Sequence, residues 1–159
     1  MRQPPVNPIA KDALKAWKIT ASIYMLILWL FIGAGVVLSV IFTIPLWYGA
    51  IGIAVGGVLH YIFVFILPKV KWKRWRYEIF DQEIYIQHGI LIVSRTLVPM
   101  IRVQHVDTKQ GPILKRYKLA SVTISTAATT HEIPALMEED ASSLRDRISA
   151  LARVDEDDV

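Results

Sequence analysis

Histidines are the side chains in this sequence best suited to acid–base or metal chemistry, but their spacing argues against both. His88, His105 and His131 fall in three separate segments, and no two stand at the i, i+2 or i, i+4 spacing of local metal ligands. The chain contains no Cys, which excludes thiolate chemistry and disulfides. The G-x-S-x-G motif and glycine-rich nucleotide loops are also missing. We therefore expect no catalytic residue, no metal, no cofactor and no small-molecule substrate, and predict that the protein is not an enzyme.

A long uncharged block indicates which elements dominate the chain. No Asp, Glu, Lys or Arg occurs from Ile19 to Pro68, although 20% of all 159 residues are charged. About 20 apolar residues span a bilayer, so the block is long enough for two helices. We expect these helices over 19–42 and 49–67, with Pro45 in the turn between them. A signal peptide fits poorly because the first apolar run is too long and no small-residue cleavage site follows it.

The excess of basic residues lies on the two flanks of this block, which carry +3 over residues 1–18 and +5 over residues 69–76. Residues 77–159 carry −4, and the net charge is +4. The positive-inside rule then places both flanks in the cytoplasm and the turn outside. The predicted topology and interface anchors after the second helix are Lys69, Lys71, Trp72, Lys73, Arg74, Trp75 and Arg76. Each Lys or Arg near the surface is attracted to anionic lipid by about 1 kcal/mol, and this attraction together with the topology is sufficient to explain the basic cluster.

Small and polar residues within the block are candidates for helix packing. Gly52 and Gly56 form a G-x-x-x-G motif, and small residues let helix backbones approach closely in lipid. Intramembrane ionisable groups are functional candidates, so His60 is compatible with a relay or transport role. A neutral His60 that is hydrogen-bonded across the helix pair is the simpler interpretation.

After Trp75 the pattern changes to alternation with period two, which is typical of strands. The expected strands are 75–80, 84–88, 90–98, 101–106, 119–125 and 131–133, and 113–118 is expected as a loop or a single helical turn. Apolar residues from Met137 to Leu151 recur at helical spacing, followed by an acidic tail. These elements predict a small β-rich domain whose open side is covered by the final helix.

A second basic group interrupts these strands and has two interpretations. It consists of Arg102, Lys109, Lys115, Arg116 and Lys118. The group is either a solvated loop or a contact for anionic headgroups or an acidic patch on a partner protein. Nucleic acid is disfavoured, because the basic excess lies beside the membrane block and the chain has no known nucleic-acid-binding motif.

Several phrases of the sequence resemble a known family. They are Val98-Pro99-Met100-Ile101-Arg102-Val103-Gln104-His105-Val106, Gly111-Pro112-Ile113-Leu114-Lys115-Arg116 and Leu119-Ala120-Ser121-Val122-Thr123-Ile124-Ser125-Thr126-Ala127. Together with the hairpin before them, they resemble the bacterial pleckstrin-homology (PH) membrane proteins of the YdbS-like family. The resemblance implies a PH-like β-roll of short antiparallel strands capped by the C-terminal helix. It also implies that the short members are partners of a longer relative with several such domains. It supplies no catalytic residues, and a phosphoinositide ligand would be fold-level analogy alone.

The expected organisation has four parts. Residues 1–18 form a cytoplasmic N-terminal segment, 19–68 a two-helix transmembrane hairpin, 69–153 a cytoplasmic PH-like domain and 154–159 an acidic tail. We expect a multi-pass protein of the bacterial cell membrane with both termini in the cytoplasm. Its expected function is that of an interaction subunit, which forms a hetero-oligomer with a larger membrane PH-domain protein. The alternatives are a sensor of anionic lipid headgroups and a component of a membrane transport or stress-resistance complex.

Overall fold

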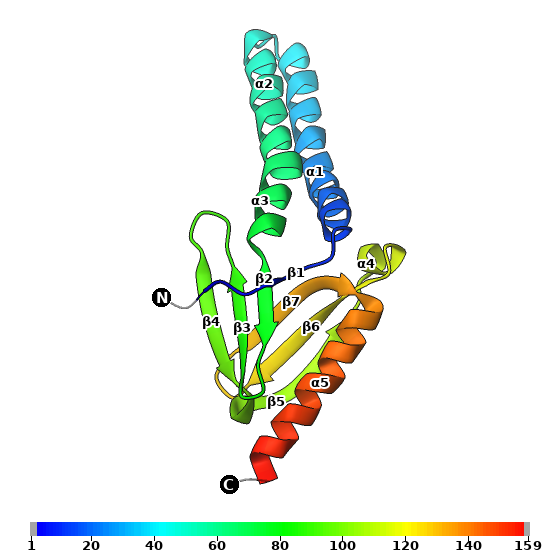
Figure 1. Cartoon of the computed structure of the whole chain (residues 1–159). Helices are drawn as coiled ribbons and strands as arrows, with labels where there is room; N and C mark the ends of the chain where they lie inside the picture. The colour runs from blue at the N-terminus through cyan, green and yellow to red at the C-terminus, as the bar shows by residue number, and fades with distance from the viewer. Residues whose placement is uncertain (1–2, 158–159) are drawn as a thin grey trace. The chain divides into compact units, whose positions relative to one another are not determined.

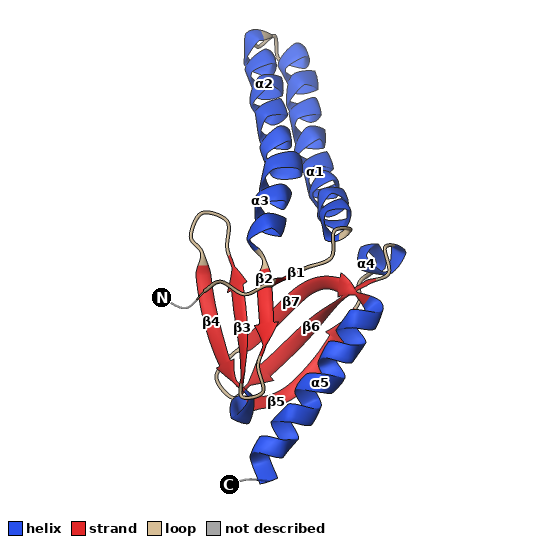
Figure 2. Ribbon diagram, viewed as in Figure 1, coloured by secondary structure: helices blue, strands red, loops and turns tan. Residues whose placement is uncertain are grey.

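The structure is a computed structural model that describes residues 3–157, and the chain forms two compact units. One unit contains Trp17–Lys69. The other combines the residues up to Ala16 with those from Val70 onward. Figure 1 traces the chain through both units, and Figure 2 shows that one is helical and that the other contains all the strands.

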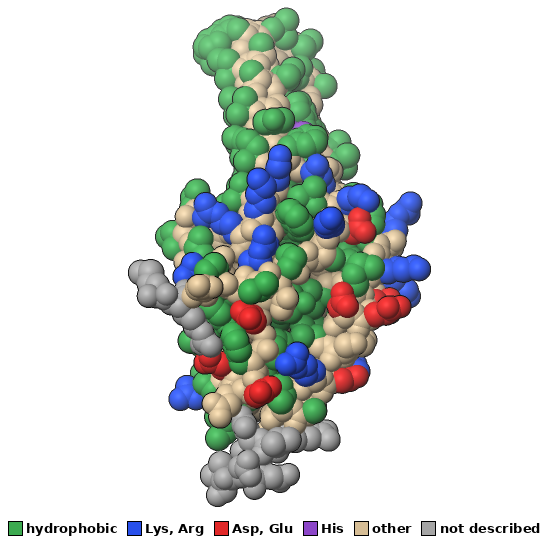
Figure 3. Space-filling view, in the orientation of Figure 1, with side chains coloured by type: hydrophobic (Ala, Val, Ile, Leu, Met, Phe, Trp, Pro, Cys, Tyr) green, Lys and Arg blue, Asp and Glu red, His purple; other side chains and the backbone are tan. Residues whose placement is uncertain are grey.

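Two apolar helical stretches make up the first unit. Helix α1 covers Ala13–Ile41, and α2 begins at Trp47 after a turn in which Thr43 has a φ of 53°. Both α1 and the stretch Trp47–Arg74 are long and apolar enough to cross a membrane. Only 6% and 11% of their most apolar windows are buried, unlike the core helices of a soluble protein. On the face that Figure 3 shows, the coloured side chains of the helical unit beyond its basic end are mostly hydrophobic, which suits helices that face lipid.

The second apolar helix extends further than the sequence analysis expected. Helix α2 (Trp47–Tyr61) continues through a π-helical turn, η1 (Ile62–Ile66), into α3 (Leu67–Arg74). The expected end at Leu67 is therefore wrong, because the basic residues up to Arg74 are helical. At the end of η1 the Leu67 N–H donates a hydrogen bond to the carbonyl of Ile62, five residues earlier, which is the spacing of a π-helix. The π-turn directly precedes Pro68, which has no N–H to donate. Because such a turn adjusts the backbone locally, the helix continues past the proline.

The second unit is built on two antiparallel sheets. The strands are β1 (Asn7–Pro8), β2 (Arg76–Ile79), β3 (Glu83–His88), β4 (Ser94–Pro99), β5 (Val103–Lys109), β6 (Leu119–Thr126) and β7 (Thr130–Met137). One sheet has the order β1-β2-β3-β4 and the other the order β5-β6-β7. A short 3-10 helix, η2 (Met100–Arg102), connects them, and α4 (Pro112–Arg116) lies between β5 and β6. With the final helix α5 (Glu138–Asp157), these elements confirm the expected PH-like roll.

Alternating aliphatic side chains form the core of this roll. Ile84 and Ile86 of β3 and Val122 and Ile124 of β6 are all at most 1% exposed. Helix α5 adds Ile148, which is fully buried. Helix α5 begins with three acidic residues, which suit the positive end of the helix dipole. The period-two pattern predicted these strands, but Tyr85, Ser121 and Thr123 are also only 4% exposed, so both faces of β3 and β6 are covered.

Three strands have limits that differ by more than one residue from those expected. The strand expected at 101–106 begins at Val103, because Met100–Arg102 form η2, and it ends at Lys109. The third strand does not begin at Ile90, because residues 90–93 form a loop and β4 starts at Ser94. The last strand runs through Pro134 rather than ending before it, since β7 lies at a sheet edge where a missing N–H is tolerated. The register shift opposite, between Ala120 and Val122, accommodates Ala135 at a φ of 51°.

The sequence analysis did not predict strand β1, which lies before the first membrane helix. Asn7 pairs with Tyr77 of β2, and the Ala10 N–H donates to the Ala135 carbonyl at 3.2 Å. Ile9 is 2% exposed. The N-terminal segment is thus part of the β-rich unit. At the other terminus, α5 continues through Asp157 into the expected acidic tail, while residues 158 and 159 lie outside the described residues.

Candidate interaction and membrane-contact surfaces

The basic helix α3 is joined to the β-rich unit by hydrogen bonds and ring packing. The Trp72 indole N–H donates to the Ala10 carbonyl at 3.0 Å. Trp75 is only 7% exposed, and its ring stacks on His88 with centroids 5.5 Å apart. Arg76 donates to the Trp75 carbonyl at 2.7 Å. These two tryptophans therefore hold α3 to its own domain.

The cations of α3 differ in exposure. Lys69 and Lys73 are exposed, whereas Lys71 and Arg74 are half-buried. Figure 3 shows Lys and Arg side chains gathered over this segment. The sheet pairing places Asn7 and Tyr77 side by side, so both flanks of the hairpin lie on one side of any bilayer that the hairpin crosses.

The second basic group is divided by strand β5. Lys115, Arg116 and Lys118 are exposed on and just after α4, and Lys109 ends β5. Arg102 directly precedes the first residue of β5. Since the strand has seven residues, Arg102 lies about 20 Å from Lys109 at the other end. The structure therefore groups four of the five cations near α4 and places Arg102 elsewhere.

The histidines of the β-rich unit are also separated. His88 packs on Trp75, His105 is exposed on β5, and His131 lies on β7. Within the part of the chain that the structure describes, no three His, Asp or Glu side chains gather closely enough to hold a metal ion. Burial raises the pKa of the Tyr77 phenol above its ordinary value, and the negative charge of Asp140 acts in the same direction.

Within the hairpin, His60 has a partner on the other helix. The Trp29 indole N–H donates to His60 Nδ1 at 3.3 Å, and the two rings are tilted at 57°. Gly56 lies where the helices approach closely, because a Cβ there would stand 2.5 Å from Ile32 Cδ1. At Gly52 the same test gives 3.9 Å, an ordinary contact. The close approach is therefore at Gly56, one turn before His60.

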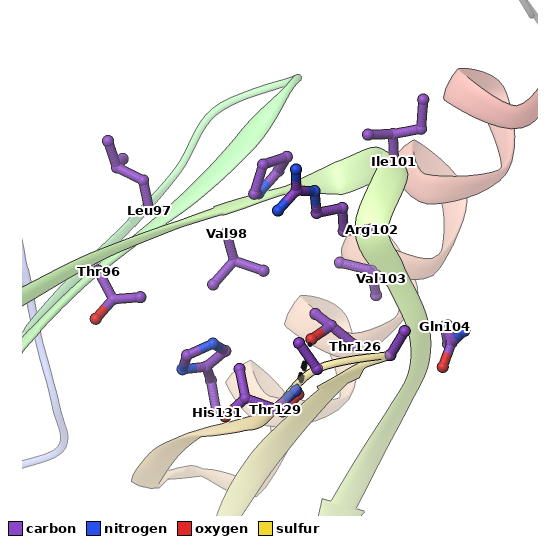
Figure 4. A pocket seen from close by; sticks show the side chains of 13 residues that line it. Thr96, Leu97, Val98, Ile101, Arg102, Val103, Gln104, Thr126, Thr129 and His131 are labelled. Carbon is purple, nitrogen blue, oxygen red and sulfur yellow. Dashed lines mark hydrogen bonds between the residues drawn. The ribbon is translucent and has the colours of Figure 1, made fainter.

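A groove that the sequence analysis did not anticipate lies between the two sheets. It has a volume of about 680 Å³, and it is lined by the end of β4, by η2, by the start of β5 and by the turn from β6 to β7. Thr96 and Val98 of β4 face His131 of β7 across this space (Figure 4). Leu97 and Ile101, at the rim of this groove, are 47% and 56% exposed, and their side chains point away from His131 (Figure 4). Exposed apolar side chains at a groove are typical of a surface that another molecule covers.

The comparison with protein families agrees with this fold. Residues 19–152 match the family described as "Bacterial PH domain", and the chain belongs to that family. It is 52% identical over 159 residues to the transmembrane protein YdbS of Bacillus subtilis (strain 168), with the whole of both chains covered. It is also 31% identical over 90 residues to the transmembrane protein YdbT of the same strain. These 90 residues are 57% of this chain and 17% of YdbT. No solved structure matches. The chain is thus a YdbS-like membrane protein with two candidate membrane helices.

Proposed function

We propose that the protein is a non-enzymatic interaction subunit that assembles with a longer membrane protein of its own family at the cytoplasmic face. The apolar rim of the groove between β4 and the β6–β7 turn carries this proposal, because Leu97 and Ile101 are exposed there on the outer side of β4 and η2. Covering such side chains is favourable at about 25 cal/mol per Å² of apolar surface. Among the described residues no three His, Asp or Glu side chains gather to hold a metal ion, so a metal-dependent reaction has no supporting observation.

Two relatives support the choice of a longer family member as the proposed partner. YdbT matches this chain over only 17% of its own length, so a much longer protein contains a segment of this kind. YdbS and YdbT belong to the same organism, which makes a short and a long member available to each other. A hairpin that tethers the domain to the bilayer raises its effective concentration for membrane neighbours. The basic flanks favour the cytoplasmic side for this assembly.

Co-purification with a charge placed in the groove tests the proposal. The tagged full-length chain is expressed with a YdbT-like protein, solubilised gently and purified as the parent, Ile101→Glu and Met137→Glu. Met137 is 40% exposed at the far end of β7 and serves as the matched control. We expect the parent and the Met137 variant to retain the partner in stoichiometric amount and the Ile101 variant to lose it. Retention by all three variants, or a parent that purifies alone in several detergents, would contradict the proposal.

The exposed cations near α4 favour a second candidate function, which is the sensing of anionic lipid headgroups. Lys115, Arg116 and Lys118 project from one short segment, and each contributes about 1 kcal/mol near an anionic surface. Charge reversal at all three positions in the full-length chain, reconstituted in vesicles, would abolish a preference for phosphatidylglycerol over phosphatidylcholine. An unchanged preference would reject this function. The full chain is needed because β1 completes the sheet from outside the C-terminal region.

A further inference from the structure

The loop between β3 and β4 exposes the most solvent-accessible large apolar side chains among the described residues. Leu91 is 92% exposed and Ile92 is 84% exposed, and Val93 follows at 41%. Phe31, the most exposed large apolar side chain of α1 and α2, reaches only 73%. Surface turns are usually polar, and an isolated aliphatic tip in water gains nothing from its exposure. The tip, defined here as residues 90–93, therefore needs an apolar environment outside its own domain.

The backbone of the tip has a fixed shape. Gly89 has a φ of 127°, and a Cβ there would stand 1.9 Å from the carbonyl oxygen of Ile92. Only glycine permits this close turn. His88 pairs with Ser94 at the base of the loop, so both strands support it. The glycine turn and the paired strands therefore fix the two ends of the tip.

The tip is held against the end of helix α3. The guanidinium Nη1 of Arg74 donates to the Leu91 carbonyl at 3.5 Å, and the Gln87 amide donates to the Arg74 carbonyl at 3.3 Å. The strand register agrees, because Arg76 pairs with Gln87 at the same end of the sheet. Figure 1 shows the β3–β4 loop beside α3. The tip thus lies at the end of the domain from which the membrane helix leaves.

The distance along α3 places this end close to the bilayer. Arg74 is seven residues after Leu67, the last residue of the apolar block before Pro68, which is about 10 Å along a helix. The polar headgroup layer on each side of the hydrocarbon core is about 5–8 Å thick. The Arg74 side chain and Arg95 at the start of β4 add positive charge beside the tip. Apolar side chains next to cations match an anionic membrane interface, where both find partners.

We propose that residues 90–93 insert into the headgroup and upper acyl region of the cytoplasmic leaflet. The tip is then a third point of membrane attachment, in addition to the two helices, and it fixes the orientation of the domain on the bilayer. The occupant of this surface is the lipid bilayer itself. The partner groove lies at the other end of β4, since Pro99 lines the groove and Ser94 adjoins the tip.

Depth-dependent quenching of a single fluorophore tests the insertion. The chain has no Cys, so Leu91→Cys gives one labelling site in the full-length protein. The control is Asp81→Cys, an exposed position in the β2–β3 turn at the other end of β3, about 20 Å away. Both variants carry the same environment-sensitive dye in vesicles of phosphatidylcholine and phosphatidylglycerol. We expect a blue-shifted emission and strong quenching by shallow spin-labelled lipid at position 91, and neither effect at position 81.

A second variant removes the possibility that the dye itself causes insertion. Val93→Cys is labelled alone and again with Leu91→Glu and Ile92→Glu, which place two carboxylates in the tip. We expect the charges to reduce lipid quenching at position 93 at least several-fold. Equal quenching at positions 91 and 81, or no effect of the two charges, would overturn the proposal. A dye at position 91 that is shielded only when a YdbT-like protein is present would also overturn it, because the tip would then be a protein interface.

Discussion

Replacing Gly89 by alanine tests directly whether the shape of the β3–β4 loop depends on glycine. The added Cβ would stand 1.9 Å from the Ile92 carbonyl oxygen, whereas Cβ atoms do not approach closer than 3.0 Å. The carbonyl must therefore retreat by at least about 1.1 Å. The φ of 127° adds strain for any residue with a side chain, of the order of 1–3 kcal/mol. We expect Gly89→Ala to destabilise the β-rich unit by about 1–3 kcal/mol.

Thermal unfolding of the full-length protein in detergent, followed by far-ultraviolet circular dichroism, measures this effect. A loss of 1 kcal/mol lowers the Tm of a domain of this size by about 4–8 °C, so we expect a fall of about 5–20 °C. Gly111→Ala is the control, because Gly111 has a φ of −80° and no atom within 4 Å of its added Cβ. Its expected change is close to zero. A Gly89 variant that melts no lower than the Gly111 variant would refute the reasoning.

Three further predictions concern the hairpin, the sheet and the topology. The hydrogen bond from Trp29 to His60 can be tested by a double-mutant cycle of Trp29→Phe and His60→Leu, measured by reversible unfolding in detergent. We expect a coupling free energy of about 0.6 kcal/mol between the two positions. Additive effects of the two substitutions would argue against the hydrogen bond. The Tyr77 phenol has a raised pKa, so its neutral form contributes stability that is full below about pH 10 and is lost as the pH rises through the pKa of the folded protein. The Tyr77→Phe variant should therefore lose less stability at alkaline pH than the parent. Identical stability-against-pH profiles of the two proteins would contradict this expectation. An impermeant maleimide should label Leu46→Cys in intact cells and Val6→Cys only after permeabilisation, and the reverse pattern would show the opposite orientation.

The elements that could be predicted from the sequence are those in which a pattern of charge or hydrophobicity extends over many residues. The uncharged block from Ile19 to Pro68 predicted the two apolar helices, because charge is excluded over the full width of a bilayer. The alternation in 119–125 predicted β6, but Ser121 and Thr123 are buried as well, so the strand is covered on both faces. The family resemblance predicted the PH-like roll, and the family match confirms it.

The features that the sequence did not predict depend on short or non-local contacts. Strand β1 is two residues long, so it has no periodicity to detect. The four aliphatic residues at 90–93 match a buried strand in composition, but Gly89 turns the chain, and Leu91, Ile92 and Val93 are exposed. The groove joins residues near Thr96 with residues near Thr129, which are brought together only by the roll. Glycine before an aliphatic run was the one local signal that could have indicated the loop.

The pairing of β1 with β2 also sets an order for the synthesis of the protein. Pro8 leaves the ribosome 68 residues before its partner Arg76, and the complete membrane hairpin lies between them. At a translation rate of about 5–20 residues per second, the first strand waits on the order of 3–14 s. During that interval both helices have to enter the bilayer and return the chain to the starting side. Pairing requires that both strands lie on one side of the membrane. If only one of the two helices crossed the bilayer, β1 and β2 would lie on opposite faces and could not pair.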